Sequence, residues 1–279
     1  MPDTIENLGD SLVQHGAHSD RVYLMRLDKA DLPGIVERID ALAQERGYSK
    51  IFVKVPAAAG DAFRGRGYEV EATIPAFFNG EEDALFMARY PDPKRKEGAP
   101  RQKIEEVLAA CRARGGAEAP PALDPGLKAA HLEPRHADEV AALYRKVFDT
   151  YPFPIHDPAY IAKTMGEGFA YFGVYDGQRL VAASSAEMDL AGAYSEMTDF
   201  ATLPECRGKG LATILLGLME DFVRPKGVRT AFTIARAVSF GMNIAFARVG
   251  YSFGGTLWNN TNISGNIESM NIWHKRLDR

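Results

Sequence analysis

The chain has 279 residues, 46% apolar and 25% charged, which is the composition of a globular protein with a sizeable core. Its net charge of −4, from 33 Lys and Arg against 37 Asp and Glu, lacks the basic excess expected of a nucleic-acid-binding protein and favours a small-molecule partner. Two isolated cysteines, no secretory leader and no apolar run of about 18 residues argue against a disulfide framework, a zinc site and a membrane span, so we expect a cytoplasmic protein.

The first predicted elements are strand 50–55, helix 58–66, strand 69–78 and strand 84–90. The end of the chain has a similar succession. In both places a Phe lies four residues before a Gly-Tyr pair and a Met lies nineteen residues after that Tyr: Phe63, Gly67, Tyr68 and Met87, then Phe246, Gly250, Tyr251 and Met270. We interpret the match as a degenerate repeat, and the alternative is two unrelated helix-glycine-strand corners.

A linker is predicted where proline, glycine and charged residues accumulate, between Tyr90 and Pro125. Apolar residues at helical spacing inside it predict a connecting helix over 101–114. We therefore expect an N-terminal α/β domain over 1–95, a linker with a helix over 96–124, and a second domain over 125–279.

Beyond the linker, apolar residues alternate between strand and helix spacing. The turn dipeptide Asp176-Gly177 joins two of the strands as a hairpin. The expected order is β-α-α-β-β-β-α-β-α-β-β: strand 127–132, helices 135–148 and 158–167, strands 170–175, 180–188 and 194–203, helix 211–223, strand 230–234, helix 239–249, and strands 251–258 and 268–276.

A ligand-binding loop is indicated between the predicted strand 194–203 and the predicted helix 211–223. It contains the segment Arg207-Gly208-Lys209-Gly210. The glycines let backbone approach an anion closely, and the free N–H groups of the helix start attract phosphate. The segment matches neither a Walker loop nor a dinucleotide fingerprint. It predicts a pyrophosphate cradle, and the alternative is a glycine-rich helix start without a ligand.

The pattern Arg207-x-x-Gly210-x-Ala212, after a strand and Pro204, resembles the acetyl-CoA signature of the GNAT superfamily of N-acetyltransferases, whose order of elements residues 125–279 follow. The resemblance implies an α/β (α+β) GNAT fold, a splayed mixed sheet flanked by helices, preceded here by a smaller degenerate GNAT-like domain. It implies acetyl-CoA as co-substrate. The residues implied in holding it are Ala201 and Leu203, through backbone groups at the pantetheine, and Arg207, Gly208, Lys209, Gly210, Leu211, Ala212 and Thr213 at the pyrophosphate.

A base is required, because an ammonium has no lone pair with which to attack a thioester. Glu196 and Asp199 lie on the strand beside the expected thioester, and Glu187 lies on the neighbouring strand. Each is a candidate base. The alternative is that these carboxylates bind the ammonium groups of the substrate or face solvent.

Two positions depart from the family pattern. Many relatives have a Tyr that protonates the leaving thiolate, and here Phe246 occupies its place; Ser239 stands where an Asn is usual. Phenylalanine donates no proton, so another donor, water or direct departure of the thiolate is required. Tyr251 is a nearby hydroxyl and is interpreted as a core residue. Ser239 and Asn243 are candidate cofactor contacts, with a surface position as the alternative for Asn243.

A narrower resemblance, to the bacterial and archaeal beta-lysine acetyltransferases, extends over almost the whole chain. It implies acetylation of the terminal amine of beta-lysine, giving a zwitterionic compatible solute. The matching stretches are 13–16, 20–25, 50–56, 67–68 and 74–78 in the N-terminal part and 196–202, 255–260 and 268–273 in the C-terminal part.

Beta-lysine has two ammonium groups and one carboxylate, so its pocket needs carboxylates, amides and a donor. The predicted substrate-binding set is Glu187, Glu196, Asp199, Asn259 and Asn260. Turn-building is the alternative role of the asparagines. His15 and His18 lack a third ligand and are not interpreted as a metal site. Two alternatives stay open: another amine acceptor such as a polyamine or aminoglycoside, and a non-catalytic CoA-binding sensor. The oligomeric state is also open, with a homodimer as one possibility.

Overall fold

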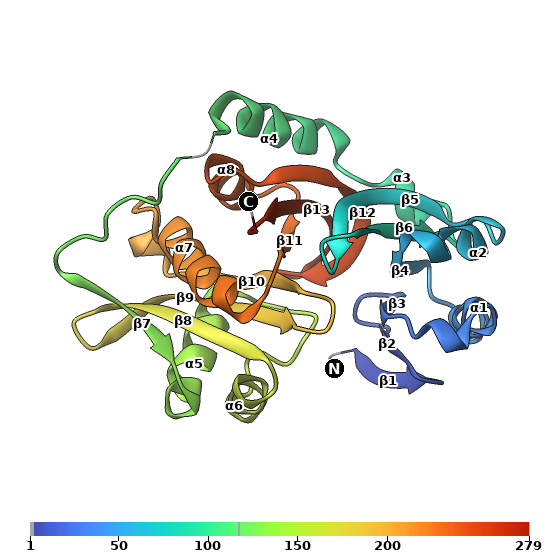
Figure 1. Ribbon diagram of the computed structural model, residues 1–279, viewed down its shortest axis with the longest axis horizontal. Coiled ribbons are helices and arrows are strands. Elements are labelled where there is room, and N and C mark those ends of the chain that lie inside the picture. Colours follow the sequence, from blue (N-terminus) through green and yellow to red (C-terminus); the bar gives the residue numbers. More distant parts are fainter. Residues whose placement is uncertain (1–2, 117, 279) are drawn as a thin grey trace.

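In the computed structural model, which describes residues 3–116 and 118–278, thirteen strands form one mixed sheet (Figure 1). Their order is β1-β2-β3-β4-β6-β5-β12-β13-β11-β10-β9-β8-β7. The first six strands of the chain occupy one half of the sheet and the last seven the other, and the halves meet between β5 and β12. The sheet is flanked by helices, as the predicted fold class requires.

The C-terminal half has the predicted order of elements, with bounds within a few residues of the expected ones. The alternation of apolar residues therefore specified this half well. Its elements are β7 (Leu127–Leu132), α5 (Ala137–Val147), α6 (Pro158–Gly166), β8 (Phe169–Asp176), β9 (Arg179–Asp189), β10 (Tyr194–Thr202), α7 (Leu211–Val223), β11 (Thr230–Arg236), α8 (Phe240–Arg248), β12 (Ser252–Ile263) and β13 (Asn266–Arg276).

The N-terminal half contains the predicted strands and more. Before residue 50, where the sequence predicts no element, it has three strands and a helix. The full set is β1 (Thr4–Leu8), β2 (Ser11–Gly16), β3 (Arg21–Arg26), α1 (Gly34–Arg46), β4 (Lys50–Pro56), α2 (Gly60–Arg64), β5 (Glu69–Phe78), β6 (Glu82–Arg89) and α3 (Lys94–Glu97). Short 3-10 turns add Lys29–Asp31, Ala57–Ala59, Pro134–His136, Pro204–Cys206 and Arg224–Lys226.

The two halves repeat one pairing scheme. In the first, β3 is parallel to β4, which pairs with β6, and β6 pairs with β5; in the second, β10, β11, β13 and β12 do the same. The corners match as well. The rings of Phe63 and Tyr68 meet edge to face at 5.4 Å, and those of Phe246 and Tyr251 at 5.1 Å. These matches support the interpretation of a degenerate repeat, which the structure extends to include β3.

Helices cover both faces of the C-terminal strands. α7 packs on one face of β8–β10 and α5 on the other. The linker helix α4 (Arg101–Arg114), which has the predicted bounds, packs along α8 on the outside of the molecule (Figure 1). In the described residues no helix is both long and apolar enough to cross a membrane.

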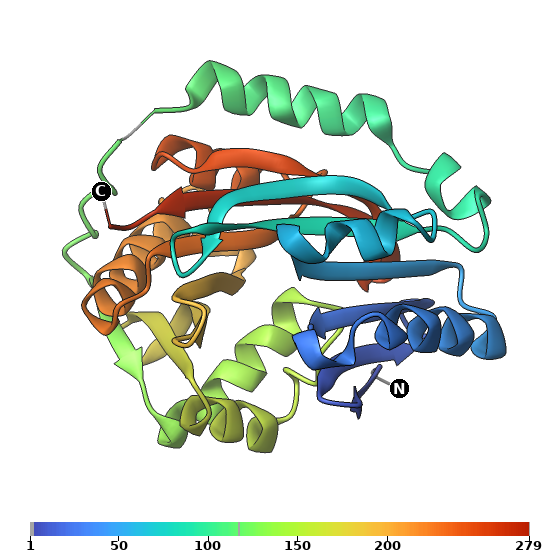
Figure 2. The ribbon, with the colours of Figure 1, turned by 45° about the vertical axis from the view of Figure 1, so that its right-hand side comes forward.

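The segment between α5 and α6 reaches the N-terminal half, since the amide of Gln14 on β2 donates to the carbonyl of Pro152. Figure 2 shows the blue N-terminal strands on the same side of the molecule as α5 and α6. The face of β9 and β10 that carries α5 is therefore also bordered by the N-terminal strands. A pocket on this face of β9 and β10 would therefore be lined by residues of both halves of the chain.

Candidate active site

A cleft opens where two parallel strands separate. β10 and β11 are paired only through Tyr194–Glu196 and Thr230–Phe232. Beyond these residues both strands line a cavity of about 580 Å³, together with the starts of α7 and α8. That volume is typical of small-molecule sites.

The loop before α7 has the features of an anion cradle. Gly208 and Gly210 adopt φ values of +82° and +72°, which residues with a Cβ rarely adopt. A Cβ at Gly208 would meet no atom within 4 Å, so open space lies beside this backbone. The 13-residue helix α7 begins directly after Gly210 and points its free N–H groups at the loop. Pyrophosphate fits this geometry.

Most of the predicted cradle residues line the cleft. They are Arg207, Gly208, Gly210, Leu211, Ala212 and Thr213. Lys209, predicted in the same group, is exposed and does not line the cavity.

The residues predicted to hold pantetheine, Ala201 and Leu203, are next to cleft-lining positions and not among them. Both are buried, and the backbone N–H of Leu203 donates to the carbonyl of Val181 near the start of β9. Because successive backbone groups of a strand point to opposite edges, Phe200 and Thr202 face the separated side, and both line the cavity. We therefore assign the backbone contacts to Phe200 and Thr202.

Asp199 lies in the wall of the cleft, at a bulge in β10. Its φ is +56°, and the register with β9 shifts between Thr198 and Ala201. The carboxylate accepts hydrogen bonds of 2.5 Å from Tyr151 Oη and from Ser185 Oγ. Burial raises the pKa of Asp199, and these hydroxyl donors oppose the increase. The result is a fixed carboxylate with increased proton affinity.

Glu187 and Glu196 form a second acidic group next to the cleft. They lie directly opposite each other on β9 and β10, which places their Cβ atoms about 5 Å apart. Burial raises the pKa of both, that of Glu196 to about 8. Repulsion from Glu187 and Asp199 raises the pKa of Glu196 further, and repulsion from Asp199 and Asp189 raises that of Glu187. Lys54, on β4 of the N-terminal half, opposes the increase in both cases. The three predicted carboxylates thus share one face of the sheet.

This acidic pair predicts a pH dependence of stability. The folded protein holds a proton on Glu196 up to a pKa of about 8, whereas the unfolded chain releases it near 4.5. The free energy of unfolding should therefore fall as pH rises through this window. In Glu196→Gln the free energy of unfolding should depend less on pH. The variant should therefore become more stable relative to wild type as pH rises from 5 to 8.

Urea unfolding at the two pH values measures the effect. Glu81→Gln, which removes an exposed carboxylate from the β5–β6 turn, is the control and should keep the wild-type slope. A Glu196→Gln protein with the slope of wild type would contradict the raised pKa.

Of the two candidate cofactor contacts predicted near the start of α8, one lines the cleft. Ser239 lines the cleft as the N-cap residue, and its side chain makes no capping bond. Asn243 is fully buried. Its amide donates to the carbonyls of Arg236 and Ser239 and its oxygen accepts from Asn271 and Trp273, so its bonding capacity is used. We do not include Asn243 in the cofactor site.

The aromatic residues of the last corner provide no proton donor to the cleft. Phe246 is fully buried and lines it, with its ring against Phe200 and Tyr251. Tyr251 belongs to the hydrophobic core, and Glu220 on α7 raises its pKa in addition to burial.

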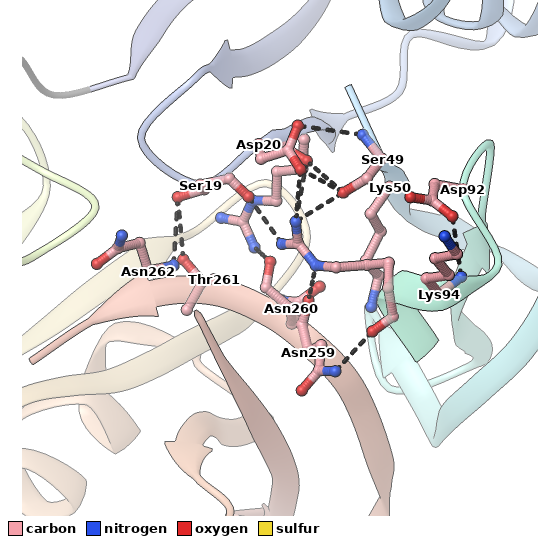
Figure 3. Close-up of polar contacts among 12 residues, drawn as sticks. Ser19, Asp20, Ser49, Lys50, Asp92, Lys94, Asn259, Asn260, Thr261 and Asn262 are labelled. Carbon is pink, nitrogen blue, oxygen red and sulfur yellow. Dashed lines mark hydrogen bonds and ion pairs between the residues drawn. The ribbon is translucent and has the colours of Figure 1, made fainter. Parts of the chain in front are cut away.

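Asn259 and Asn260 lie away from the cleft, in contact with the N-terminal half (Figure 3). The side-chain amide of Asn259 donates to the backbone carbonyl of Arg95. The backbone carbonyl of Asn259 accepts from Arg95 Nε at 2.8 Å. The carbonyl of Asn260 accepts from Arg21 at 2.8 Å. Because its side chain bonds to the N-terminal half, we assign Asn259 to that contact and not to the acceptor pocket. Asn260 contributes its backbone carbonyl, and its side-chain Oδ1 is buried without a hydrogen-bond partner among the described residues, so a role of that side chain at the acceptor stays a prediction.

Tyr151, Ser185 and Lys54 are residues of the site that the sequence did not identify. Tyr151 and Ser185 carry no local signal, because only the fold brings them to Asp199. Lys54 did carry one: it interrupts the apolar strand Lys50–Pro56. Among residues 3–116 and 118–278, no group of three His, Cys, Asp or Glu side chains is placed to bind a metal.

Comparison with known proteins agrees with this geometry. Residues 137–251 match the sequence model of the acetyltransferase (GNAT) family. The chain is 38% identical over 273 residues to a Beta-lysine N(6)-acetyltransferase of Methanococcus maripaludis, covering 98% of each chain. It is 34% identical to the N-acetyltransferase YodP of Bacillus subtilis, covering 96% of each, and 30% identical to a Beta-lysine N(6)-acetyltransferase of Methanosarcina mazei, covering 87% of this chain and 97% of the other.

Proposed function

The chain belongs to the acetyltransferase (GNAT) family, and from this premise we propose that it transfers the acetyl group of acetyl-CoA to the terminal amine of beta-lysine. The observation that carries the proposal is the 38% identity to a protein of that activity over 98% of both chains. The acidic groups beside the cleft support it. A diamine needs carboxylates at both ends, and Asp199 and the Glu187–Glu196 pair supply them.

The cleft fits the co-substrate. Acetyl-CoA supplies an acetyl group activated as a thioester. We propose that Arg207 and the loop with Gly208 and Gly210 hold its pyrophosphate, and that the backbone of Phe200 and Thr202 holds its pantetheine, because these groups line the cavity. Ser239 contributes a hydroxyl at the start of α8.

Asp199 is the proposed base. It lies in the cleft, whereas Glu196 and Glu187 are set back along the strands. Its carboxylate accepts a proton from the terminal ammonium, and the freed nitrogen lone pair forms a bond to the acetyl carbon as the carbon–sulfur bond breaks. Because burial raises its pKa, Asp199 is a stronger base than an exposed aspartate. Tyr151 and Ser185 hold the carboxylate in place.

The leaving sulfur receives no proton from position 246, because Phe246 has no ionisable group. We propose that it departs as a thiolate and receives, through water, the second proton that the acetylated nitrogen releases. The product keeps one ammonium and one carboxylate. It is therefore a zwitterion without net charge, a form suited to a compatible solute, and we propose that the enzyme makes it in the cytoplasm.

A panel of acceptors tests the function. With acetyl-CoA and free-thiol detection, beta-lysine should be turned over with the highest kcat/KM, ahead of alpha-lysine and spermidine. Higher kcat/KM with spermidine would assign a polyamine acceptor in its place. Coenzyme A binding without turnover of any amine would identify a sensor.

A further inference from the structure

Lys54 projects from the N-terminal half toward the acidic pair. On β4, Ile51, Val53 and Val55 pack into the core beneath α1, so the alternating residues Phe52 and Lys54 face the other way. The ammonium of Lys54 lies over two rings of the C-terminal half, 5.0 Å from the centroid of Tyr194 and 5.5 Å from that of Phe232. It therefore reaches β10 and β11.

The ammonium lacks a bonded partner within the part of the chain that the structure describes. No hydrogen bond or ion pair within 4.0 Å is found for it among residues 3–116 and 118–278, although it is near enough to lower the pKa of both Glu187 and Glu196. Lys50 on the same strand behaves differently: its ammonium is fully buried and is bonded to Glu71 at 2.9 Å and to the carbonyl of Trp258 at 2.7 Å. Lys50 is a structural residue, whereas Lys54 has bonding capacity to spare.

We propose that Lys54 binds the carboxylate of the acceptor, so that the N-terminal half completes the acceptor pocket and selects amines that carry an acid group. The proposal rests on the proposed function. Its chemistry is complementary: an acceptor with two ammonium groups and one carboxylate meets Asp199, the Glu187–Glu196 pair and Lys54.

The order of these groups along the sheet matches the order of groups along the acceptor. Thr198 and Ile234 line the cleft, and Glu196 and Phe232 lie two residues before them on the same faces of β10 and β11, about 7 Å further from the cleft opening. An acceptor with its terminal amine at Asp199 would extend toward Glu196, where the second ammonium binds. Lys54, over Phe232, would then bind the adjacent carboxylate.

Arg21 is the alternative cation on this side. Both of its terminal nitrogens are already engaged, and among the described residues its Nε alone has no partner. Its two terminal nitrogens donate to the carbonyl of Asn260 and to Gln14 Oε1, at 2.8 Å and 3.2 Å. Lys54 is thus the better partner for a substrate carboxylate.

The test compares two acceptors that differ only in the carboxylate, beta-lysine and 1,4-diaminopentane. Lys54→Met should lower kcat/KM for beta-lysine about tenfold, through KM, since a charge-assisted hydrogen bond contributes about 1.5 kcal/mol or more. It should leave kcat/KM for 1,4-diaminopentane within about twofold of wild type. Lys54→Arg should retain most of the activity on beta-lysine. Lys128→Met, on the exposed edge strand β7, is the matched control.

Each outcome decides the matter. Equal losses on both acceptors would show that Lys54 acts only on the acidic pair and would overturn the proposal, as would no loss on either. Both results leave acetylation of beta-lysine intact. Failure of the wild-type enzyme to acetylate beta-lysine would overturn the proposed function and this proposal together. The wild-type enzyme should itself have a kcat/KM about tenfold lower for 1,4-diaminopentane than for beta-lysine. This comparison does not depend on whether a variant folds.

Discussion

Asp199→Asn is expected to lower kcat by about 10²- to 10⁴-fold, the usual contribution of general acid–base catalysis. The amide cannot accept the proton of the terminal ammonium. The backbone should tolerate the change, because Asp199 has φ +56° and Asn is one of the few residues that adopt this region readily. KM for beta-lysine should change much less than kcat.

Glu196→Gln distinguishes the role of Asp199 from that of the Glu187–Glu196 pair. If the Glu187–Glu196 pair binds the second ammonium, this variant should mainly raise KM, with a smaller effect on kcat. The measurement is steady-state kinetics over pH 6 to 9, with circular dichroism as the folding control. Near-native kcat in Asp199→Asn together with loss of kcat in Glu196→Gln would transfer the role of base to Glu196.

Gly208→Val is expected to weaken coenzyme A binding about 100-fold or more. The side chain would enter the open space beside the loop, and the loop would leave its φ of +82°, so that more than one hydrogen bond to pyrophosphate is lost, each contributing about 1.5–3 kcal/mol. Gly210 is a less suitable position, since its Cβ would lie 2.7 Å from Pro121 and the linker itself would be displaced.

Gly227→Val provides a matched control. Gly227 has a φ of +92°, and a Cβ there also meets no atom within 4 Å, but it lies between α7 and β11 and does not line the cleft. Calorimetry should find wild-type affinity for coenzyme A in this control. Equal affinities for coenzyme A in the two variants would show that the loop with Gly208 does not bind the cofactor.

The local sequence pattern was sufficient to predict the elements of the C-terminal half and the backbone shape of the glycine loop before α7. Periodicity specifies which face of an element is apolar, and Gly208 and Gly210 specify a backbone shape, so both are readable from neighbouring residues. The same reasoning should have found α1, where Ile35, Ile39 and Ala43 recur at helical spacing before Gly47.

Strand β2 shows why other elements were missed. Ser11, Gln14 and His15 are polar but buried, because their partners come from the rest of the fold; Gln14 bonds to Pro152, 138 residues away. A pattern based on hydrophobicity does not detect such a strand. Asn243 and Asn259 illustrate the same limit, since their side chains suit a ligand as well as a buried network.

The bulge at Asp199 shows why the backbone groups open to the cleft could not be chosen from the sequence. The family resemblance implied Ala201 and Leu203, and the register with β9 shifts between Thr198 and Ala201, just before them. Only the backbone conformation reveals which amides face the separated strand. Residues brought together from distant segments, such as Lys54 and Glu196, require the complete fold.

The central claim, acetylation of beta-lysine at its terminal amine, is tested most directly by kcat/KM for beta-lysine and alpha-lysine together with fragmentation spectra of the products. The isomers share the terminal amine and differ in where the second amine lies relative to the carboxylate. A group left unpaired by the wrong isomer costs about 1–3 kcal/mol, so we expect a preference of roughly 5- to 150-fold for beta-lysine, with the acetyl group on the terminal nitrogen. Equal kcat/KM for the two isomers, or an acetyl group on the beta-amine, would contradict the account.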